Sequence, residues 1–406
     1  MDRVDRFRGC ILGLAVGDAL GHPTEFISSV EGIKRRFGPE GIKDFAGQGG
    51  HPPGTFTDDT QMTIGVLRAL VRRGHGPLDE LMRCMGEEFV AWSHHRENNR
   101  APGGTCLTGC RNFEVKRDWK SSGVKQSKGC GAAMRAAPVG LFCQDDEALV
   151  RLAAAQSVLT HSHPTGIASS VAAAAAVAHV VRHQSLDGLF DFVVSCVEKC
   201  DEKLFVEFGA TPALSASVGN REQLALLERM KAALGEETDD VCRLLGGAWV
   251  GEEAVATALW CVLKTGGDFE ASVRRGANSS GDSDSIATIA GSICGALKGV
   301  EAIDARFLSQ LEKAAQLDVL ARYLWWVAQT GTDVASLPGP LDFYGAEGAS
   351  PRGGEGEIEH DDSELEDDSD LGGDLEGDEG AAPGAPDSPP EGEAPKPVGA
   401  VQLSMF

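Results

Sequence analysis

Apolar residues recur at steps of three and four along most of this chain. The clearest stripes are Met62, Val66 and Leu70 in one segment and Ile286, Ile289, Ile293 and Leu297 in another. This spacing matches the 3.6-residue turn of an amphipathic helix, and no segment shows the convincing alternation of a half-buried strand. The pattern therefore predicts an all-α fold.

The same periodicity predicts helices over residues 5–21, 60–73, 78–94, 153–182 with a break at 161–164, 185–245 with a polar turn at 216–221, 254–264 and 305–329. Residues 93–131 form a polar stretch, with eight Arg or Lys against three Asp or Glu between Ser93 and Lys128. We expect this stretch to be either a solvated loop or a surface that receives an anionic ligand or an acidic partner.

Two of the predicted helices carry glycines at steps of four. These are Gly9, Gly13, Gly17 and Gly21 in the first helix and Gly291, Gly295 and Gly299 near residue 290. Glycine has no Cβ, so a neighbouring backbone can approach it closely. We expect the two helices to pack against each other, which would bring Glu25 and the acidic stretch at Asp282–Asp284 to one site.

Two predicted helices also begin with a hydroxyl and two carboxylates. One begins with Thr57-Asp58-Asp59-Thr60 and the other with Asp282-Ser283-Asp284-Ser285. One such patch reads simply as an N-cap, because unpaired amides and the helix dipole favour carboxylates there. Two such patches in one chain suggest that both contribute ligands to one cation site. Oxygen ligands without nearby His or Cys suit Mg²⁺ or Mn²⁺ better than zinc, and two such cations could act in hydrolysis.

Taken with three further stretches, these residues resemble the signature of the ADP-ribosylglycohydrolases, in particular an arginine-directed bacterial subgroup. The further stretches are Gly17–Glu25, Gly129–Pro138 and Leu159–His161. All five occur in the family's order, over roughly residues 5 to 335. The resemblance implies an orthogonal helical bundle with a central two-metal cleft, which we assign to residues 1–345.

The resemblance also implies roles for individual residues. The expected ligands of two Mg²⁺ ions, with Mn²⁺ possible, are Thr57, Asp58, Asp59, Asp282, Asp284 and Ser285. The expected catalytic residues are Glu25, Asp58 and Asp59. The expected substrate contacts are Gly129, Cys130, Gly131, Met134 and His161. The implied partner is an ADP-ribosylated protein or ADP-ribose, and the implied reaction removes ADP-ribose from a side chain, with arginine the first choice.

Several alternatives remain open on the sequence. The scissile bond could link ADP-ribose to serine or another group, or the chain could be a non-catalytic ADP-ribose reader. Cys130 stands where many members carry Asn, and it could be a nucleophile if His161 came close. His161 could equally be a core or cap residue, and Trp249 is expected in the core.

Composition limits the class of protein. The net charge is −24, of which residues 351–406 carry 17 acidic and 2 basic side chains, a balance of −15, leaving −9 for the remaining 350 residues. Nucleic acid is therefore an unexpected partner. Eleven cysteines without a CxxC pair indicate reduced thiols in a cytoplasmic protein, expected to be monomeric. No signal peptide and no segment long enough to span a bilayer are expected. Residues 346–406, acidic and rich in Gly and Pro, are expected to be disordered.

Overall fold

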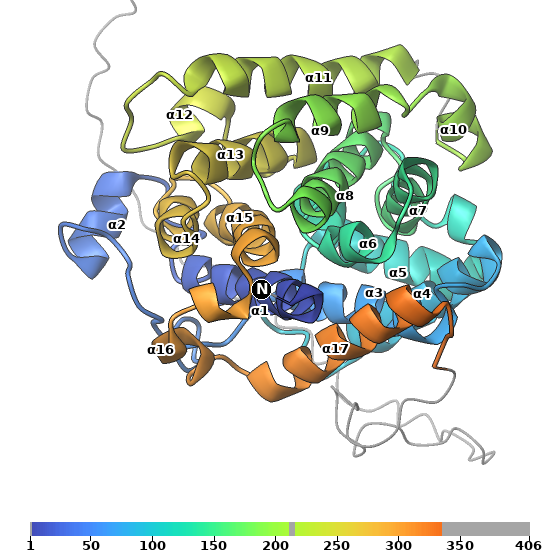
Figure 1. Ribbon diagram of the computed structural model, residues 1–406, viewed down its shortest axis with the longest axis horizontal. Helices are drawn as coiled ribbons and strands as arrows, with labels where there is room; N and C mark the ends of the chain where they lie inside the picture. The colour runs from blue at the N-terminus through green and yellow to red at the C-terminus, as the bar shows by residue number, and fades with distance from the viewer. Residues whose placement is uncertain (1, 211–215, 335–406) are drawn as a thin grey trace, which may run out of the picture. The chain divides into compact units, whose positions relative to one another are not determined.

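The computed structural model describes residues 2–210 and 216–334, and these residues form the all-α fold that the sequence predicts (Figure 1). The predicted boundary at residue 345 and the predicted disordered tail lie outside the described residues. The first eight helices are α1 (Arg3–Gly21), α2 (Val30–Phe37), α3 (Asp58–Arg73), α4 (Leu78–Ser93), α5 (Gly104–Lys116), α6 (Ala137–Phe142), α7 (Asp146–Val158) and α8 (Pro164–His183). The others are α9 (Leu189–Glu198), α10 (Glu202–Glu207), α11 (Ala216–Ala233), α12 (Cys242–Leu245), α13 (Gly251–Lys264), α14 (Phe269–Ala277), α15 (Ser283–Lys298), α16 (Ala305–Leu308) and α17 (Ala314–Thr330). Three short 3₁₀ turns, η1 (Trp119–Ser121), η2 (Cys130–Ala132) and η3 (Val300–Ala302), complete the set.

Figure 1 shows α8, α14 and α15 nearly end-on, whereas α11 and α17 run across the view. Helices therefore cross at steep angles, as expected for an orthogonal bundle. Helix α17 packs on α1 and α3, and α14, α13 and α8 surround α15.

Helices α1 and α15 lie side by side, and their glycines form the contact. A Cβ added to Gly9 would lie 2.3 Å from the carbonyl oxygen of Gly295, and one added to Gly13 would lie 2.5 Å from that of Gly291. At Gly17 the obstacle is the carbonyl oxygen of Ala287, at 2.1 Å. No side chain fits between backbones this close, so the predicted packing of the two glycine-bearing helices is confirmed.

One described helix, α8, is long and apolar enough to cross a membrane, so the expectation that no segment reaches that length was wrong. The whole apolar window of α8 is buried within the fold. A helix that is apolar on all sides is equally suited to the centre of a large helical protein.

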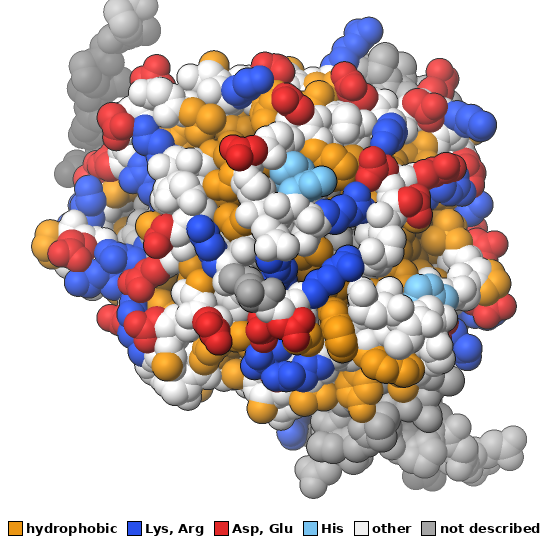
Figure 2. All heavy atoms as spheres, viewed as in Figure 1, with side chains coloured by type: hydrophobic (Ala, Val, Ile, Leu, Met, Phe, Trp, Pro, Cys, Tyr) orange, Lys and Arg blue, Asp and Glu red, His pale blue; other side chains and the backbone are white. Residues whose placement is uncertain are grey.

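The polar stretch at residues 93–131 contains a helix, α5, where the sequence suggested a loop. Helix α5 buries Cys106, Cys110 and Phe113 on one face, and this short stripe is the signal that polar composition obscured. The face of the fold seen in Figure 2 carries acidic and basic side chains intermixed, without the extended basic surface that nucleic-acid binding usually requires.

Candidate active site

The start of α15 is held against the end of α1. A Cβ on Gly21 would lie 2.4 Å from the Cα of Asp284, so only glycine fits at this point. Just beyond, the Thr24 hydroxyl lies 2.9 Å from the Ser283 hydroxyl and 2.6 Å from the carbonyl oxygen of Ala277. These contacts place Glu25, which is 8% exposed, beside the acidic start of α15.

The start of α3 is held by Asp18, a fully buried residue of α1. Its two carboxylate oxygens accept hydrogen bonds from the amides of Thr57 and Thr60, both at 2.9 Å, and from their hydroxyls at 2.8 and 2.6 Å. Asp18 lies within the Gly17–Glu25 stretch, but the sequence did not predict a role for it. The available signal was a carboxylate inside an otherwise apolar, glycine-bearing helix.

A pocket opens where the starts of α3 and α15 face the Gly-Cys-Gly turn. Its lining includes every predicted site residue except Thr57: Glu25, Asp58, Asp59, Gly129, Cys130, Gly131, Met134, His161, Asp282, Asp284 and Ser285. It also includes Phe26, Ala101, Gly103, Gly104, Thr105, Cys106 and Trp249. The hydroxyl of Thr57 is instead bonded to Asp18. The structure thus brings the two acidic patches and the glycine turn together, although the acidic patches lie more than two hundred residues apart in sequence.

Burial and mutual repulsion raise the pKa values of the clustered carboxyls. Burial, followed by the charges of Asp282 and Asp58, raises the pKa of Glu25 to about 9. Burial is also the first cause for Asp58, whose pKa rises to about 7, and for Asp59 and Asp284, whose pKa values lie well above the ordinary range. The cluster is therefore costly to ionise without a compensating positive charge.

The donors around the pocket fit a hard divalent cation. Buried oxygens of Glu25 (Oε2) and Asp59 (Oδ1) have no hydrogen-bond partner among the described residues. Such oxygens, with carboxylates opposite them, are the ligands that Mg²⁺ and Mn²⁺ prefer. Within residues 2–210 and 216–334, no three His, Cys, Asp or Glu side chains are already gathered as a closed ligand group. The fit therefore lies in donor chemistry and charge, and not in a preformed shell.

Cys130 faces the acidic start of α15. Its thiol donates to Asp282 Oδ2 at 2.9 Å, and the Ser285 hydroxyl donates to its sulfur at 3.6 Å. Burial, and then the charge of Asp282, raises the pKa of this thiol well above its ordinary value. A thiol held protonated is a poor nucleophile. Cys130 therefore supplies one hydrogen-bond donor at this turn.

The glycines on either side of Cys130 allow close approach. A Cβ on Gly131 would lie 2.6 Å from the sulfur of Cys106 and 2.9 Å from the His161 ring. The turn is anchored to the chain before α13, because the Cys130 amide donates to the carbonyl oxygen of Trp249 at 3.3 Å.

His161 lines the pocket as a neutral ring. Its Nδ1 lies 2.8 Å from the Thr160 hydroxyl, and the side chain is almost completely buried. Burial, with a smaller effect from the nearby Arg135 charge, lowers the pKa of His161 to about 3.

Trp249 is not a core residue, contrary to the expectation. It is 48% exposed and stacks on Phe26, which is 64% exposed, with ring centroids 6.1 Å apart and planes 20° from parallel. Both rings line the pocket. The apolar run around Trp249 suggested burial because the exposed turn before α13 leaves no mark on sequence periodicity.

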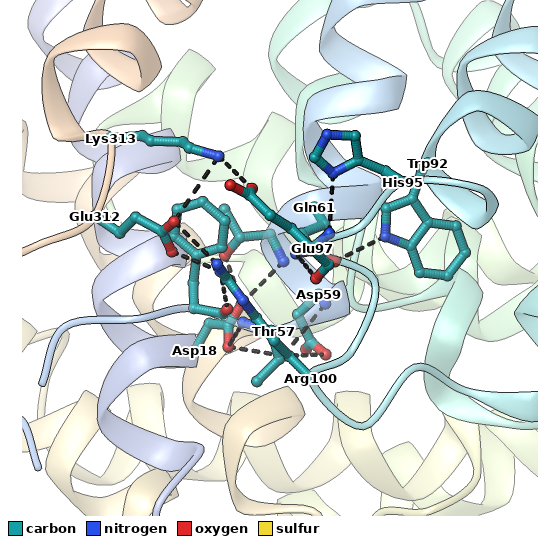
Figure 3. Close-up of polar contacts among 12 residues, drawn as sticks. Asp18, Thr57, Asp59, Gln61, Trp92, His95, Glu97, Arg100, Glu312 and Lys313 are labelled. Atoms are coloured by element: carbon teal, nitrogen blue, oxygen red, sulfur yellow. Dashed lines mark hydrogen bonds and ion pairs between the residues drawn. The ribbon is translucent and has the colours of Figure 1, made fainter. Parts of the chain in front are cut away.

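Arg100 precedes the pocket-lining residues Ala101 to Thr105, and its guanidinium points towards Glu312 (Figure 3). Arg100 is 7% exposed, pairs with both carboxylate oxygens of Glu312 at 2.6 and 3.1 Å, and donates to the carbonyl oxygen of Phe56. The amide of Gly103 then donates to Asp58 Oδ2 at 3.0 Å. This member of the basic segment therefore supports the acidic start of α3 and is not a free surface charge.

Comparison with known proteins agrees with this geometry. The family model for ADP-ribosylglycohydrolase matches residues 1–333. The ADP-ribosyl-[dinitrogen reductase] glycohydrolase of Rhodospirillum rubrum is 27% identical over 81% of this chain and 98% of its own length. The ADP-ribosylarginine hydrolase Tri1 of Serratia proteamaculans is 25% identical over 80% of this chain and 81% of its own.

A solved structure described as an ADP-ribosylglycohydrolase-related protein complex superimposes with a TM-score of 0.60. It is 26% identical and covers 80% of this chain and 99% of its own. The family model matches residues 1–333, and the solved structure shares the architecture of the chain, so both comparisons support the same family assignment. The chain belongs to the ADP-ribosylglycohydrolase family, enzymes that hydrolyse the glycosidic bonds of ADP-ribosylated substrates.

Proposed function

We propose that this chain is a Mg²⁺-dependent hydrolase that removes ADP-ribose from modified protein side chains, with ADP-ribosyl-arginine as its principal substrate. One observation carries the proposal. Carboxylates from two helix starts line a single pocket opposite the glycine turn and His161. An anionic ligand can enter an acidic pocket only if positive charge is supplied there, and bound cations supply it.

Divalent-metal dependence belongs to the family, and the number and kind of ion form part of our proposal. Two Mg²⁺ ions, replaceable by Mn²⁺, would be held by Thr57, Asp58, Asp59, Asp282, Asp284 and Ser285. Thr57 would have to share its hydroxyl between Asp18 and a cation. Bound cations would polarise the ribose hydroxyls and lower the pKa of a water.

The chain's own carboxyl groups would accept and donate the protons of the hydrolysis. Asp58 or Asp59 would orient the attacking water and accept its proton, since both line the pocket. Glu25 lines the same pocket and would assist by passing a proton to the departing side chain. The proton lost by water and the proton gained by the leaving nitrogen balance the hydrolysis.

The rest of the pocket would bind ADP-ribose. Gly129 and Gly131 allow the backbone to approach the ligand, and Met134 and His161 border the same space. The exposed rings of Phe26 and Trp249 offer flat faces on which an adenine could stack.

The proposal also specifies which side chain carries the ADP-ribose that is removed. The arginine assignment is supported by the likeness to an ADP-ribosylarginine hydrolase. Serine-linked and other ADP-ribose adducts are the alternative substrates, and a reader that binds without turnover is the alternative class. A monomer in the cytoplasm is also proposed, and the eleven cysteines, none of which forms a disulfide among the described residues, are consistent with a reducing compartment.

The decisive experiment measures free ADP-ribose released from an arginine-ADP-ribosylated protein, in Mg²⁺ and in EDTA, with a serine-linked substrate in parallel. We expect metal-dependent release from the arginine substrate and loss of both turnover and Mg²⁺ binding in Asp284→Ala. Release only from the serine substrate would move the assignment to that linkage. Binding of ADP-ribose without any release would identify a reader.

A further inference from the structure

Arg135 is a fully buried cation that makes no ion pair with the described residues and is hydrogen-bonded to Gly131, which lines the pocket. Its guanidinium donates to Gln156 Oε1 at 2.9 Å, to the carbonyl oxygen of Gly131 at 2.8 Å and to the Thr160 hydroxyl at 2.7 Å. The arrangement links this charge to the glycine turn and to the residue before His161. Neither the proposed chemistry nor the ligand set uses Arg135 or Thr160.

The hydrogen bonds fix the direction of the Thr160 proton. An arginine can only donate, so the Thr160 oxygen must accept from Arg135. A threonine hydroxyl has one proton to give, and among the described residues the acceptor within reach is His161 Nδ1, at 2.8 Å. The Thr160 oxygen has a second lone pair, but if it also accepted from an Nδ1–H, the hydroxyl proton of this fully buried residue would have no acceptor among the described residues. The hydroxyl therefore donates to Nδ1, and the ring proton is on Nε2.

The other edge of the ring faces the glycine turn. A Cβ on Gly129 would lie 3.2 Å from His161 Nε2, and one on Gly131 would lie 2.9 Å from Cε1. Both glycines line the pocket, as does His161 itself. The low pKa of the ring, about 3, agrees with a single ring proton at neutral pH.

We propose that Arg135 and Thr160 are positioning residues that hold His161 in the neutral Nε2–H tautomer, so that the ring presents a fixed hydrogen-bond donor to an oxygen of the bound ligand. The opposite tautomer would turn a lone pair towards that oxygen and repel it. The identity of the ligand as ADP-ribose rests on the proposed function, but the tautomer does not.

Long-range ¹H–¹⁵N correlation spectra of the full chain, labelled at histidine, test the tautomer directly. The His161 signals are identified as those that vanish in His161→Gln. We expect Nε2 protonated and Nδ1 unprotonated in the wild-type protein. A protonated Nδ1, alone or in an imidazolium, would overturn the proposal without any variant needing to fold.

Substitution of Thr160 tests the relay, by which we mean the hydrogen bonds from Arg135 to Thr160 and from Thr160 to His161. Thr160→Val keeps the shape and removes the hydroxyl, so His161 should shift towards the Nδ1–H tautomer or a mixture, and ADP-ribose should bind about tenfold more weakly. Thr160→Ser restores the hydroxyl and should restore both readouts. An unchanged tautomer in a folded Thr160→Val protein would contradict the relay.

Thr257→Val is the matched control. Thr257 is fully buried and its hydroxyl has no partner among the described residues, so its loss should leave the His161 spectrum and ADP-ribose affinity unchanged. If no variant, including wild type, binds ADP-ribose in calorimetry, the proposed function fails while the spectra still decide the tautomer. If wild type binds and Thr160→Val binds equally well, the donor role fails on its own.

Discussion

Gly21 touches Asp284 so closely that a single methyl group would separate them, because an added Cβ would lie 2.4 Å from the Asp284 Cα and 2.6 Å from its amide nitrogen. The end of one central helix is thus the support for an acidic residue at the start of the other. The position of this carboxylate depends on a residue that has no side chain.

Gly21→Ala should therefore displace Asp284 from the pocket. Overpacking a tight contact of this kind costs about 1–3 kcal/mol of stability, and we expect the free energy of unfolding to fall by that amount with a larger loss of turnover. Denaturant unfolding and ADP-ribose release measure the two effects. Gly235→Ala, where an added Cβ meets nothing within 4 Å, is the control. It should change neither the free energy of unfolding nor the rate of ADP-ribose release appreciably. Full activity in Gly21→Ala would contradict the close fit.

Asp18→Asn should loosen the start of α3. The asparagine NH₂ would face donors from Thr57 or Thr60, leaving at least one buried donor without an acceptor, at a cost of about 1–3 kcal/mol for each. We expect a lower unfolding free energy together with weaker Mg²⁺ binding in calorimetry. Asp187→Asn, at an exposed position, serves as the control for the change of charge. Unaltered Mg²⁺ affinity would show that the ligands do not depend on this support.

Cys130→Ser should keep most of the activity. Burial raises the pKa of the thiol, so we expect it not to act as a nucleophile, and a serine hydroxyl can still donate to Asp282. Cys130→Ala removes the donor and should reduce kcat more than the serine variant does. The kinetics of ADP-ribose release distinguish them. Complete inactivation of Cys130→Ser, with ligand binding intact, would restore the covalent alternative.

Without metal, the protein should lose stability as pH rises. Glu25 has an ordinary pKa of 4.5 and a folded-state pKa of about 9, so the folded protein holds this proton more tightly than the unfolded chain. Its contribution is complete below pH 4.5 and disappears as pH climbs to about 9. Melting temperatures in EDTA should fall across this range, less steeply in Glu25→Gln. Mg²⁺ should raise them most at the alkaline end. Equal slopes for the two proteins would refute this origin.

Trp249→Ala should weaken ADP-ribose binding, because an exposed ring beside Phe26 would no longer offer a stacking surface. Loss of one base–aromatic contact costs about 1–3 kcal/mol, which corresponds to roughly five- to 150-fold in Kd. Trp326→Ala is the control, since Trp326 is 40% exposed on α17 and does not line the pocket. Equal binding by both variants would remove the aromatic pair from the site.

The helical architecture was predictable because apolar periodicity and glycine spacing are local signals. Steps of four from Gly9 and from Gly291 indicated two helices able to touch, and that contact set the geometry of the acidic cluster. The pairing of Asp58 with Asp284 in one pocket followed from motif and packing together. The chemical roles of these residues remain predictions.

Other features could not be predicted because they depend on contacts distant in sequence. Arg100 belongs to a basic stretch, yet its partner Glu312 lies 212 positions away, so nothing local marked it as buried. Asp18 accepts from residues about forty positions on. Trp249 lies in an apolar run, and only the turn before α13 exposes it. A local sequence pattern shows which face of a helix is apolar, but it does not show which distant residues pack against that face.

The close packing of α1 against α15 also determines how the active site would be lost on heating. Glu25, Asp282 and Asp284 stand at or just beyond the ends of the two helices whose backbones are in contact, so these three carboxylates cannot separate while those helices remain paired. Amide hydrogens in this region should exchange with solvent only through global opening, at the slowest rates in the molecule. Thermal inactivation should then coincide with cooperative unfolding, and a folded but inactive form should not accumulate on heating.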